Sequence, residues 1–274
     1  MTINCKGELI DLKTPKVMGI LNITPDSFYD GGKYRNESDI LSQIEIMLRE
    51  GATFLDVGAY SSRPGAADVS EVLELKRIVP VVELILNNFP KAILSIDTFR
   101  SKVAKECVAL GAAMVNDISA GLQDEKMIGT IASLGIPYCM MHMRGTPKNM
   151  QGKTAYKKLE KDILYYFSER LSVAKAHGIK DIVIDPGFGF SKTLEQNYRL
   201  LKNLDLFQMV GHPILVGISR KSMIYKLLDT TPNEALNGTT AMHITALDKG
   251  AHILRVHDVK EAMECVKLHM QLNA

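Results

Sequence analysis

The sequence lacks the features that mark several classes of protein. No apolar stretch approaches the length of about 18 residues that a membrane-spanning helix needs. The first residues, MTINCKGELI, lack the charged and then apolar pattern of a signal peptide. Its four cysteines are far apart, with neither CxxC nor disulfide-framework spacing. We therefore expect a cytoplasmic protein with no membrane partner, whose cysteines are small core residues in a reducing compartment.

An excess of charge of one sign is also absent. The 33 Lys and Arg residues are nearly balanced by 31 Asp and Glu, and both signs are scattered along the chain. We expect no nucleic-acid partner, because a nucleic-acid footprint needs clustered basic residues, and any anionic ligand must be held locally. With few Pro and Gly, 46% hydrophobic residues and no linker or repeat, residues 1–274 are predicted to form a single domain with a large core.

Short aliphatic runs alternate with longer amphipathic stretches along most of the chain, which is the pattern of strands followed by helices. Glycines just past the amphipathic stretches, such as Gly135, and capping-box patterns at Thr193 with Gln196 and Asp258 with Glu261 mark helix ends. Eight runs are apolar enough for buried parallel strands, at 17–21, 53–57, 92–96, 112–116, 136–141, 181–184, 213–217 and 252–256.

Eight strand–helix units in a chain of this length predict an α/β fold, a closed (β/α)8 TIM barrel, with a short N-terminal hairpin that closes its bottom. An open doubly wound sheet is the alternative. Against it, neither GxGxxG nor GxxxxGK[ST] follows the first strand, and a sheet of about five or six strands would leave units unused.

Polar residues follow nearly every predicted strand, where the chemistry of a barrel gathers. Any one of them alone fits a helix cap or a turn. A barrel, however, brings them all to one mouth, where unsatisfied carboxylates and amides need a ligand or each other. In chain order they are Asn22, Asp56, Asp97, Asn116, His142, Asp185, Ser219 with Lys221, and Arg255 with His257.

Within this ring, residue chemistry separates two subsets. The first offers carboxylate and amide groups that suit a flat heterocycle with several N–H donors, and consists of Asp97, Asn116 and Asp185. The second offers donors and positive charge that suit a phosphate or pyrophosphate at the rim, and consists of Arg63, Lys221, Arg255 and His257. Together they describe a site for a nitrogen heterocycle that carries a phosphoryl group.

Three local motifs have both structural and functional interpretations. DPGFGFSK (185–192) fits a tight turn as well as a backbone that passes close to a ligand. GISRKSM (217–223) fits a solvated basic turn as well as an anion site at a helix start. Cys139 and His142 are a weak sign of zinc, and we interpret His142 as a structural histidine.

Taken together, the motifs resemble the dihydropteroate synthase family of pterin-binding enzymes, from about Val17 to the C-terminal helix. They are MGILNITPDSF (18–28), SSRPGA (61–66), SIDT (95–98), VNDI (115–118), MHMRGTP (141–147), DPGFGF (185–190), GISRKSMI (217–224) and RVHDV (255–259). The resemblance implies a TIM-barrel transferase of folate biosynthesis, usually a homodimer. Such an enzyme joins 6-hydroxymethyl-7,8-dihydropterin pyrophosphate to p-aminobenzoate with the help of Mg2+, giving 7,8-dihydropteroate and pyrophosphate, and is inhibited by sulfonamides.

Carried over position by position, the resemblance gives each site residue a role. The pterin would be held by Asp97, Asn116, Asp185 and Lys221, the pyrophosphate by Arg63, Arg255 and His257, and the magnesium by Asn22. The p-aminobenzoate pocket would be shaped by Phe28, Ser62, Pro64, Phe190 and Ser222. The loop after Asn22 is interpreted as a mobile lid, with Asp26 facing the cationic intermediate or a rim arginine and a hinge at Gly31 and Gly32.

The expected mechanism is dissociative substitution, in which the carbon–oxygen bond to pyrophosphate breaks before the arylamine attacks. The chain departs from the common bacterial pattern at Ala59, Tyr60 and Ser62, but has no insertion after Ser62 of the kind found in sulfonamide-insensitive relatives. We therefore expect a sulfonamide-sensitive enzyme. Two alternatives stay open, a catalytically silent pterin-binding homologue and a barrel like the folate-dependent methyltransferases, which have no reason to keep a pyrophosphate site.

Overall fold

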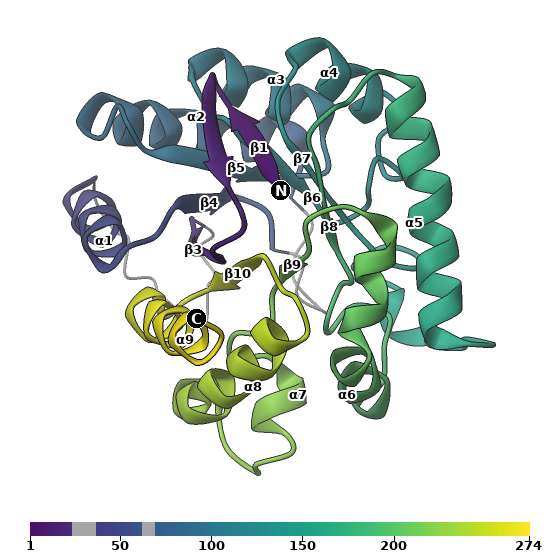
Figure 1. The fold of residues 1–274 in the computed structure, drawn as a ribbon. Helices are drawn as coiled ribbons and strands as arrows, with labels where there is room; N and C mark the ends of the chain where they lie inside the picture. Colours follow the sequence, from purple (N-terminus) through teal and green to yellow (C-terminus); the bar gives the residue numbers. More distant parts are fainter. Residues whose placement is uncertain (24–36, 62–68) are drawn as a thin grey trace.

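The computed structural model describes residues 1–23, 37–61 and 69–274 (Figure 1). Within these ranges the predicted apolar runs form eight parallel strands, which are β3 (Lys16–Asn22), β4 (Phe54–Gly58), β5 (Ile93–Asp97), β6 (Met114–Asp117), β7 (Tyr138–Met141), β8 (Ile182–Asp185), β9 (Leu215–Val216) and β10 (Ile253–Val256). They pair in the order β8-β7-β6-β5-β4-β3-β10-β9.

The sheet closes on itself between its two end strands. Ile184 of β8 pairs with Ile214 in a parallel bridge, and its amide donates to the carbonyl of Pro213 at 2.9 Å. The predicted (β/α)8 TIM barrel is therefore confirmed, and the doubly wound alternative is excluded, because an open sheet would leave these two edges apart.

Helices surround the strands on the outside of the barrel (Figure 1). They are α1 (Glu37–Glu50), α2 (Glu71–Asn88), α3 (Ser101–Leu110), α4 (Met127–Leu134), α5 (Leu159–Ala176), α6 (Leu194–Lys202), α7 (Ser222–Tyr225), α8 (Leu236–Asp248) and α9 (Val259–Leu272), with short 3-10 turns at Met150–Gly152, Leu204–Val210 and Pro232–Glu234. Outward-facing Leu55 and Val57 of β4 join the apolar faces of these helices, such as Ile44 and Met47 of α1, in one buried cluster. Among the described residues, none of the helices has the length and apolarity needed to cross a bilayer.

The two capping-box patterns have different outcomes. Thr193 begins α6 as predicted, because its hydroxyl accepts from the Gln196 amide at 3.2 Å and the Gln196 side chain accepts from the Thr193 amide at 2.9 Å. The capping box predicted at Asp258 with Glu261 was wrong. Its carboxylate instead accepts two hydrogen bonds from Arg220, at 2.6 and 2.7 Å, and such a bidentate charged pair is stronger than a single cap bond.

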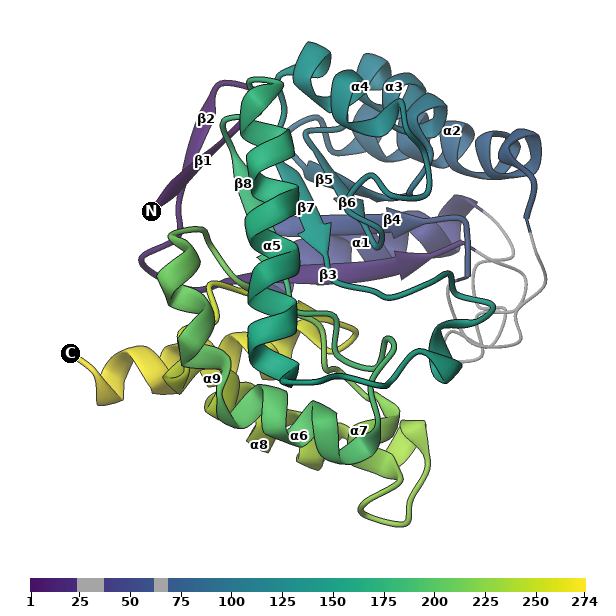
Figure 2. The same ribbon diagram turned by 90° about the vertical axis from the view of Figure 1, so that its right-hand side faces the viewer.

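The predicted N-terminal hairpin is also confirmed. Strands β1 (Thr2–Cys5) and β2 (Glu8–Asp11) pair antiparallel, and Figure 2 shows them at the end of the barrel where the parallel strands begin. Ile3, Cys5 and Ile10 pack against the first inward-facing residues of the strands, among them Met18 and Phe54. The bottom of the barrel is therefore filled with apolar side chains, which leaves the opposite mouth for polar groups.

Candidate functional site

Alternation along the strands places polar side chains inside the barrel near its C-terminal mouth. In β5, Ile93 faces the apolar bottom cluster, and Ser95 and Asp97 then follow on the same face. The register pairs Asp56 with Ser95, and Asp97 with Asn116, across neighbouring strands. The strand-end residues predicted from the sequence therefore share one interior surface rather than separate turns.

Arg255 joins two carboxylates at the centre of this surface. Its Nε donates to Asp56 Oδ2 at 2.6 Å, and its Nη2 donates to Asp97 Oδ2 at 2.7 Å. Asn116 Nδ2 also donates to Asp56 Oδ2, at 3.0 Å. The sequence analysis placed Asp56 in the ring but gave it no role. Its position inside an apolar run, rather than after one, is the signal that could have singled out a buried charge.

One guanidinium cannot neutralise both carboxylates. Burial raises the pKa of Asp97 to about 7, since the opposing effect of Arg255 is incomplete and Asp56 adds repulsion. Burial acts against the charge of Arg255, but Asp56 and Asp97 outweigh it and raise the pKa of Arg255 above its ordinary value. Asp97, with a side chain 20% exposed, is thus a carboxyl group that can exchange a proton near neutral pH.

Asp185, at the end of β8, lies in a second cluster of charged side chains. Its Oδ1 accepts from the Gly187 amide at 2.7 Å. Burial raises the pKa of Asp185, and the ammonium of Lys221 opposes this shift most strongly. Lys221 Nζ donates to the Phe188 carbonyl at 2.5 Å and lies 4.8 Å from the centre of the Phe190 ring. Burial lowers the pKa of Lys221 to about 8, although Asp185 acts in the opposite direction.

The two subsets separated by residue chemistry are therefore not separate in space. Arg255 lies against Asp97 and Lys221 lies near Asp185, so these two cations are interleaved with the acids rather than gathered at a rim. His257 is also at the mouth, where its amide donates to Ser219 Oγ at 3.2 Å and its Nδ1 lies 3.1 Å from the same oxygen. The structure thus brings the acidic and basic groups into one mixed-charge surface.

The remaining predicted residues fall into two sets. Asn22 ends β3, half-buried, and its side chain makes no hydrogen bond to the described residues; Ser222 is the first residue of α7. In the described ranges no group of three or more His, Cys, Asp and Glu side chains could hold a metal. The predictions that lie outside the described residues are Asp26, Phe28, Gly31, Gly32, Ser62, Arg63 and Pro64.

Apolar side chains form a wall beside the charged surface. Ile118, Met141, Met143 and Met150 are buried in one cluster, and Phe190 packs against it. The sequence analysis did not identify this cluster, because its members come from three separate loops and strand ends. A flat ring bound at the mouth would thus meet both charge and an apolar face.

Tyr60, one of the departures noted in the sequence, has aromatic and cationic neighbours. Its ring meets the Phe99 ring edge-on at 5.0 Å, and the Arg100 guanidinium lies 5.4 Å from its centre. Arg100 forms an ion pair with Glu74 of α2, which also accepts from Thr98 Oγ1 at 2.7 Å. This buried group ties α2 to the loop that follows Asp97.

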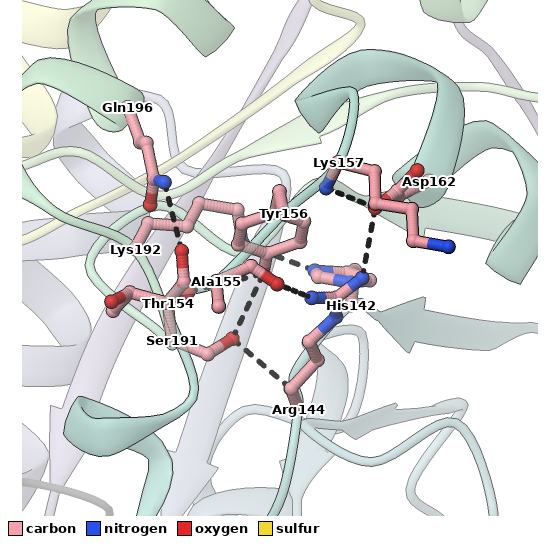
Figure 3. Close-up of polar contacts among 10 residues, drawn as sticks. All are labelled: His142, Arg144, Thr154, Ala155, Tyr156, Lys157, Asp162, Ser191, Lys192 and Gln196. Carbon is pink, nitrogen blue, oxygen red and sulfur yellow. Dashed lines mark hydrogen bonds and ion pairs between the residues drawn. The ribbon is translucent and has the colours of Figure 1, made fainter.

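His142 has the structural role that the sequence predicted. It is buried at the end of β7, and burial, with the charges of Lys192 and Arg144, lowers its pKa well below the ordinary value. Its Nδ1 lies 3.1 Å from Lys192 Nζ (Figure 3). All four cysteines are buried and free, as expected, and Cys139 packs in the bottom cluster of the barrel.

Comparisons with known proteins point in one direction. The family model of pterin binding enzymes matches residues 18–257. Dihydropteroate synthase of Escherichia coli K12 is 43% identical over 98% of this chain and 95% of its own length, and that of Haemophilus influenzae is 42% identical over 98% of each. The crystal structure of Yersinia pestis dihydropteroate synthase with a sulfonamide drug complex has a TM-score of 0.95 and 43% identity, and covers 100% of this chain and 99% of that one.

Proposed function

Because the chain belongs to the dihydropteroate synthase family of pterin-binding enzymes, we propose that it joins 6-hydroxymethyl-7,8-dihydropterin pyrophosphate to p-aminobenzoate, yielding 7,8-dihydropteroate and pyrophosphate. The observation that carries the proposal is the mixed-charge surface at the barrel mouth. There, Asp97, Asn116 and Asp185 offer acceptors and a donor amide for a pterin, with Lys221 and Arg255 among them. A protein that only packed a barrel would have no need for so many buried charges.

The acidic side chains act on the pterin. As the carbon–oxygen bond to pyrophosphate breaks, positive charge develops on the pterin methylene and spreads into the ring. Asp97 and Asp185 place carboxylates where they stabilise this charge, and Asn116 and Lys221 orient the ring. No side chain has to act as a nucleophile, because the arylamine of p-aminobenzoate attacks the methylene itself.

The basic side chains act on the departing pyrophosphate. Arg255 uses Nε and Nη2 on the two carboxylates, while its Nη1 has no hydrogen-bond partner among the described residues. The N–H groups of Nη1 can bind phosphoryl oxygens while Nε and Nη2 stay bonded to the two carboxylates. His257, held by Ser219, is the second such group in the proposal, and Arg63 is the third.

A single neutral amide oxygen, that of Asn22, is the protein ligand proposed for Mg2+. The donor type fits, since carbonyl oxygens suit Mg2+, and in phosphate sites substrate phosphates and water supply much of its coordination. When bound, the ion would neutralise charge on the pyrophosphate.

The proposal is tested by measuring pyrophosphate release from the purified protein with Mg2+ and both substrates, and with each component omitted in turn. Release that needs both substrates is the expected result. A catalytically silent homologue would bind the pterin without release, and a methyltransferase-like barrel would release nothing; either outcome would overturn the proposal. Asp185→Asn should lower turnover about 100-fold, whereas Tyr156→Phe, outside the charged surface, should keep it.

Sulfonamide inhibition and assembly follow from the same proposal. A sulfonamide should compete with p-aminobenzoate in that assay, and turnover that ignores the drug at high concentration would contradict the proposed p-aminobenzoate pocket at Phe190 and Ser222. We also propose that the protein works in the cytoplasm as a homodimer. Each chain would form a single pterin-binding domain over residues 1–274. Light scattering that gives the mass of one chain would contradict the dimer.

A further inference from the structure

Lys192 lies at the end of the loop that follows β8, and its amine bonds back to two carbonyls of that loop. The residue is only 4% exposed. Its Nζ lies 2.8 Å from the carbonyl oxygen of Gly187 and 3.0 Å from that of Phe190. It also lies 3.1 Å from Nδ1 of His142, the contact that Figure 3 shows. A buried amine with three partners, two of them backbone carbonyls of one short loop, fixes the shape of that loop.

The first of these carbonyls belongs to the residue that orients Asp185. Gly187 donates its amide to Asp185 Oδ1 at 2.7 Å while its carbonyl accepts from Lys192 at 2.8 Å. The loop backbone also lies directly on the end of β7. Gly187 has φ +74°, and a Cβ atom there would lie 2.1 Å from the His142 carbonyl oxygen. Lys192 therefore holds the carbonyl of the residue whose amide sets the direction of the Asp185 carboxylate.

The second carbonyl belongs to the residue whose ring faces Lys221. The Phe190 ring centre lies 4.8 Å from Lys221 Nζ, and the same ammonium donates to the Phe188 carbonyl at 2.5 Å. Asp185, Phe188 and Phe190 thus lie on one segment, and each has a group close to Lys221. Lys192 binds the Gly187 and Phe190 carbonyls of that loop, whereas Lys221 binds the Phe188 carbonyl between them.

Protonation does not change what the amine offers this loop. Burial lowers the pKa of Lys192 well below its ordinary value, and Asp185 opposes the shift. As an ammonium it can donate to all three partners. As a neutral amine it can still donate to the two carbonyls and accept from His142.

We propose that Lys192 is a positioning residue for pterin binding, which it serves by holding the Gly187 and Phe190 carbonyls so that Asp185 and Lys221 face the substrate. This inference rests on the proposed function, and it assigns Lys192 no contact with the substrate. Its effect is on the affinity for pterin pyrophosphate, because Asp185 and Lys221 are the proposed pterin contacts and both depend on the shape of this loop.

Other bonds attach the same segment without touching Gly187 or Phe190, and they offer a matched control (Figure 3). Tyr156 Oη donates to the Ser191 carbonyl at 3.0 Å, and the Arg144 amide donates to Ser191 Oγ at 3.0 Å. Tyr156→Phe removes the bond of Oη to the Ser191 carbonyl and its 3.4 Å contact with Ser191 Oγ. It keeps the ring against Arg144, whose guanidinium lies 3.8 Å from its centre. If any loss of bonds in this region weakened the site, this variant would reveal it.

The test compares Lys192→Met, Lys192→Gln and Tyr156→Phe in the full chain. The dissociation constant of pterin pyrophosphate is measured by titration calorimetry with Mg2+, and kcat and both KM values by pyrophosphate release. Lys192→Met should raise the pterin dissociation constant and its KM about tenfold, with a smaller change in kcat. Lys192→Gln keeps two N–H donors on a shorter side chain and should lie between it and the native protein. Tyr156→Phe should stay within about twofold of native.

Opposite results would separate a structural role from a positioning role. A partly unfolded sample lowers apparent kcat without raising KM, so a loss of kcat alone in Lys192→Met would overturn the proposal. Equal losses of pterin affinity in Lys192→Met and Tyr156→Phe would also overturn it. If Lys192→Met does not fold, Lys192→Gln decides, and native affinity in that variant contradicts the proposal. Absence of turnover in the native protein would instead refute the proposed function.

Discussion

Replacing Asp97 with Asn should change how the stability of the protein depends on pH. Burial raises the pKa of Asp97 from its ordinary 3.8 to about 7, because Arg255 is shared with Asp56 and only partly compensates. A raised pKa means that the folded protein binds this proton more tightly than the unfolded chain. The resulting stabilisation is fully present below about pH 4 and is lost as pH rises through about 7.

The size of the effect follows from the same shift. Each unit of pKa difference corresponds to about 1.4 kcal/mol, so a shift of roughly three units gives at most about 4 kcal/mol over the whole window. The slope of unfolding free energy with pH is at most about 1.4 kcal/mol per unit. Coupling to Asp56 and Arg255 reduces this value, because they share the same charge network. The amide of the Asp97→Asn variant has no such proton to lose, whereas other titrating groups are present in both proteins.

Urea unfolding followed by circular dichroism measures this difference directly. The free energy of unfolding of the native protein minus that of Asp97→Asn should fall by about 1 kcal/mol per unit between about pH 5 and about pH 7, and then level off. When both proteins also carry Arg255→Met, the same difference should keep falling beyond about pH 7, because the shared cation that favours the Asp97 carboxylate is gone. A difference that is constant or rises over this window would show that Asp97 stays ionised, and would refute the reasoning.

Three further predictions concern the framework of the site. Gly187→Ala should lower the free energy of unfolding by about 1–3 kcal/mol, because Gly187 has φ +74° and an added Cβ would lie 2.1 Å from the His142 carbonyl; an unchanged melting temperature would contradict this. Glu74→Ala leaves Arg100, with a side chain only 16% exposed, without its ion-pair partner and should destabilise by about 3–5 kcal/mol in urea unfolding, whereas a loss under about 1 kcal/mol would mean that solvent replaces Glu74. Thr193→Ala should remove about 1 kcal/mol, since its hydroxyl caps α6, and Thr193→Ser should restore it if the cap bond is the cause.

Much of the site was predictable because barrels place chemistry at strand ends. Asp97, Asn116 and Asp185 follow or end short apolar runs, and the structure places them on the inner surface of the mouth. The interleaving of charges was not predictable from residue type. Arg255 reaches Asp56 and Asp97 across 199 and 158 positions of sequence, so nothing local to RVHDV indicates these partners. In the same way, the box pattern at Asp258 was wrong because Arg220 is a stronger partner than a helix amide.

The sequence by itself determined the elements and their order, because the period of apolar residues decides between strand and helix over short distances. The hairpin at the bottom and the polar mouth also follow from patterns within single segments. Only the tertiary structure decided which charges share a partner and which side chains of separate strands meet. Lys192 bonds the Gly187 and Phe190 carbonyls within its own glycine-rich motif, but its contact with His142 spans 50 positions of sequence and requires the pairing of β7 with β8. Such contacts depend on the distance between strands that are far apart in sequence, and local propensity contains no information about that distance.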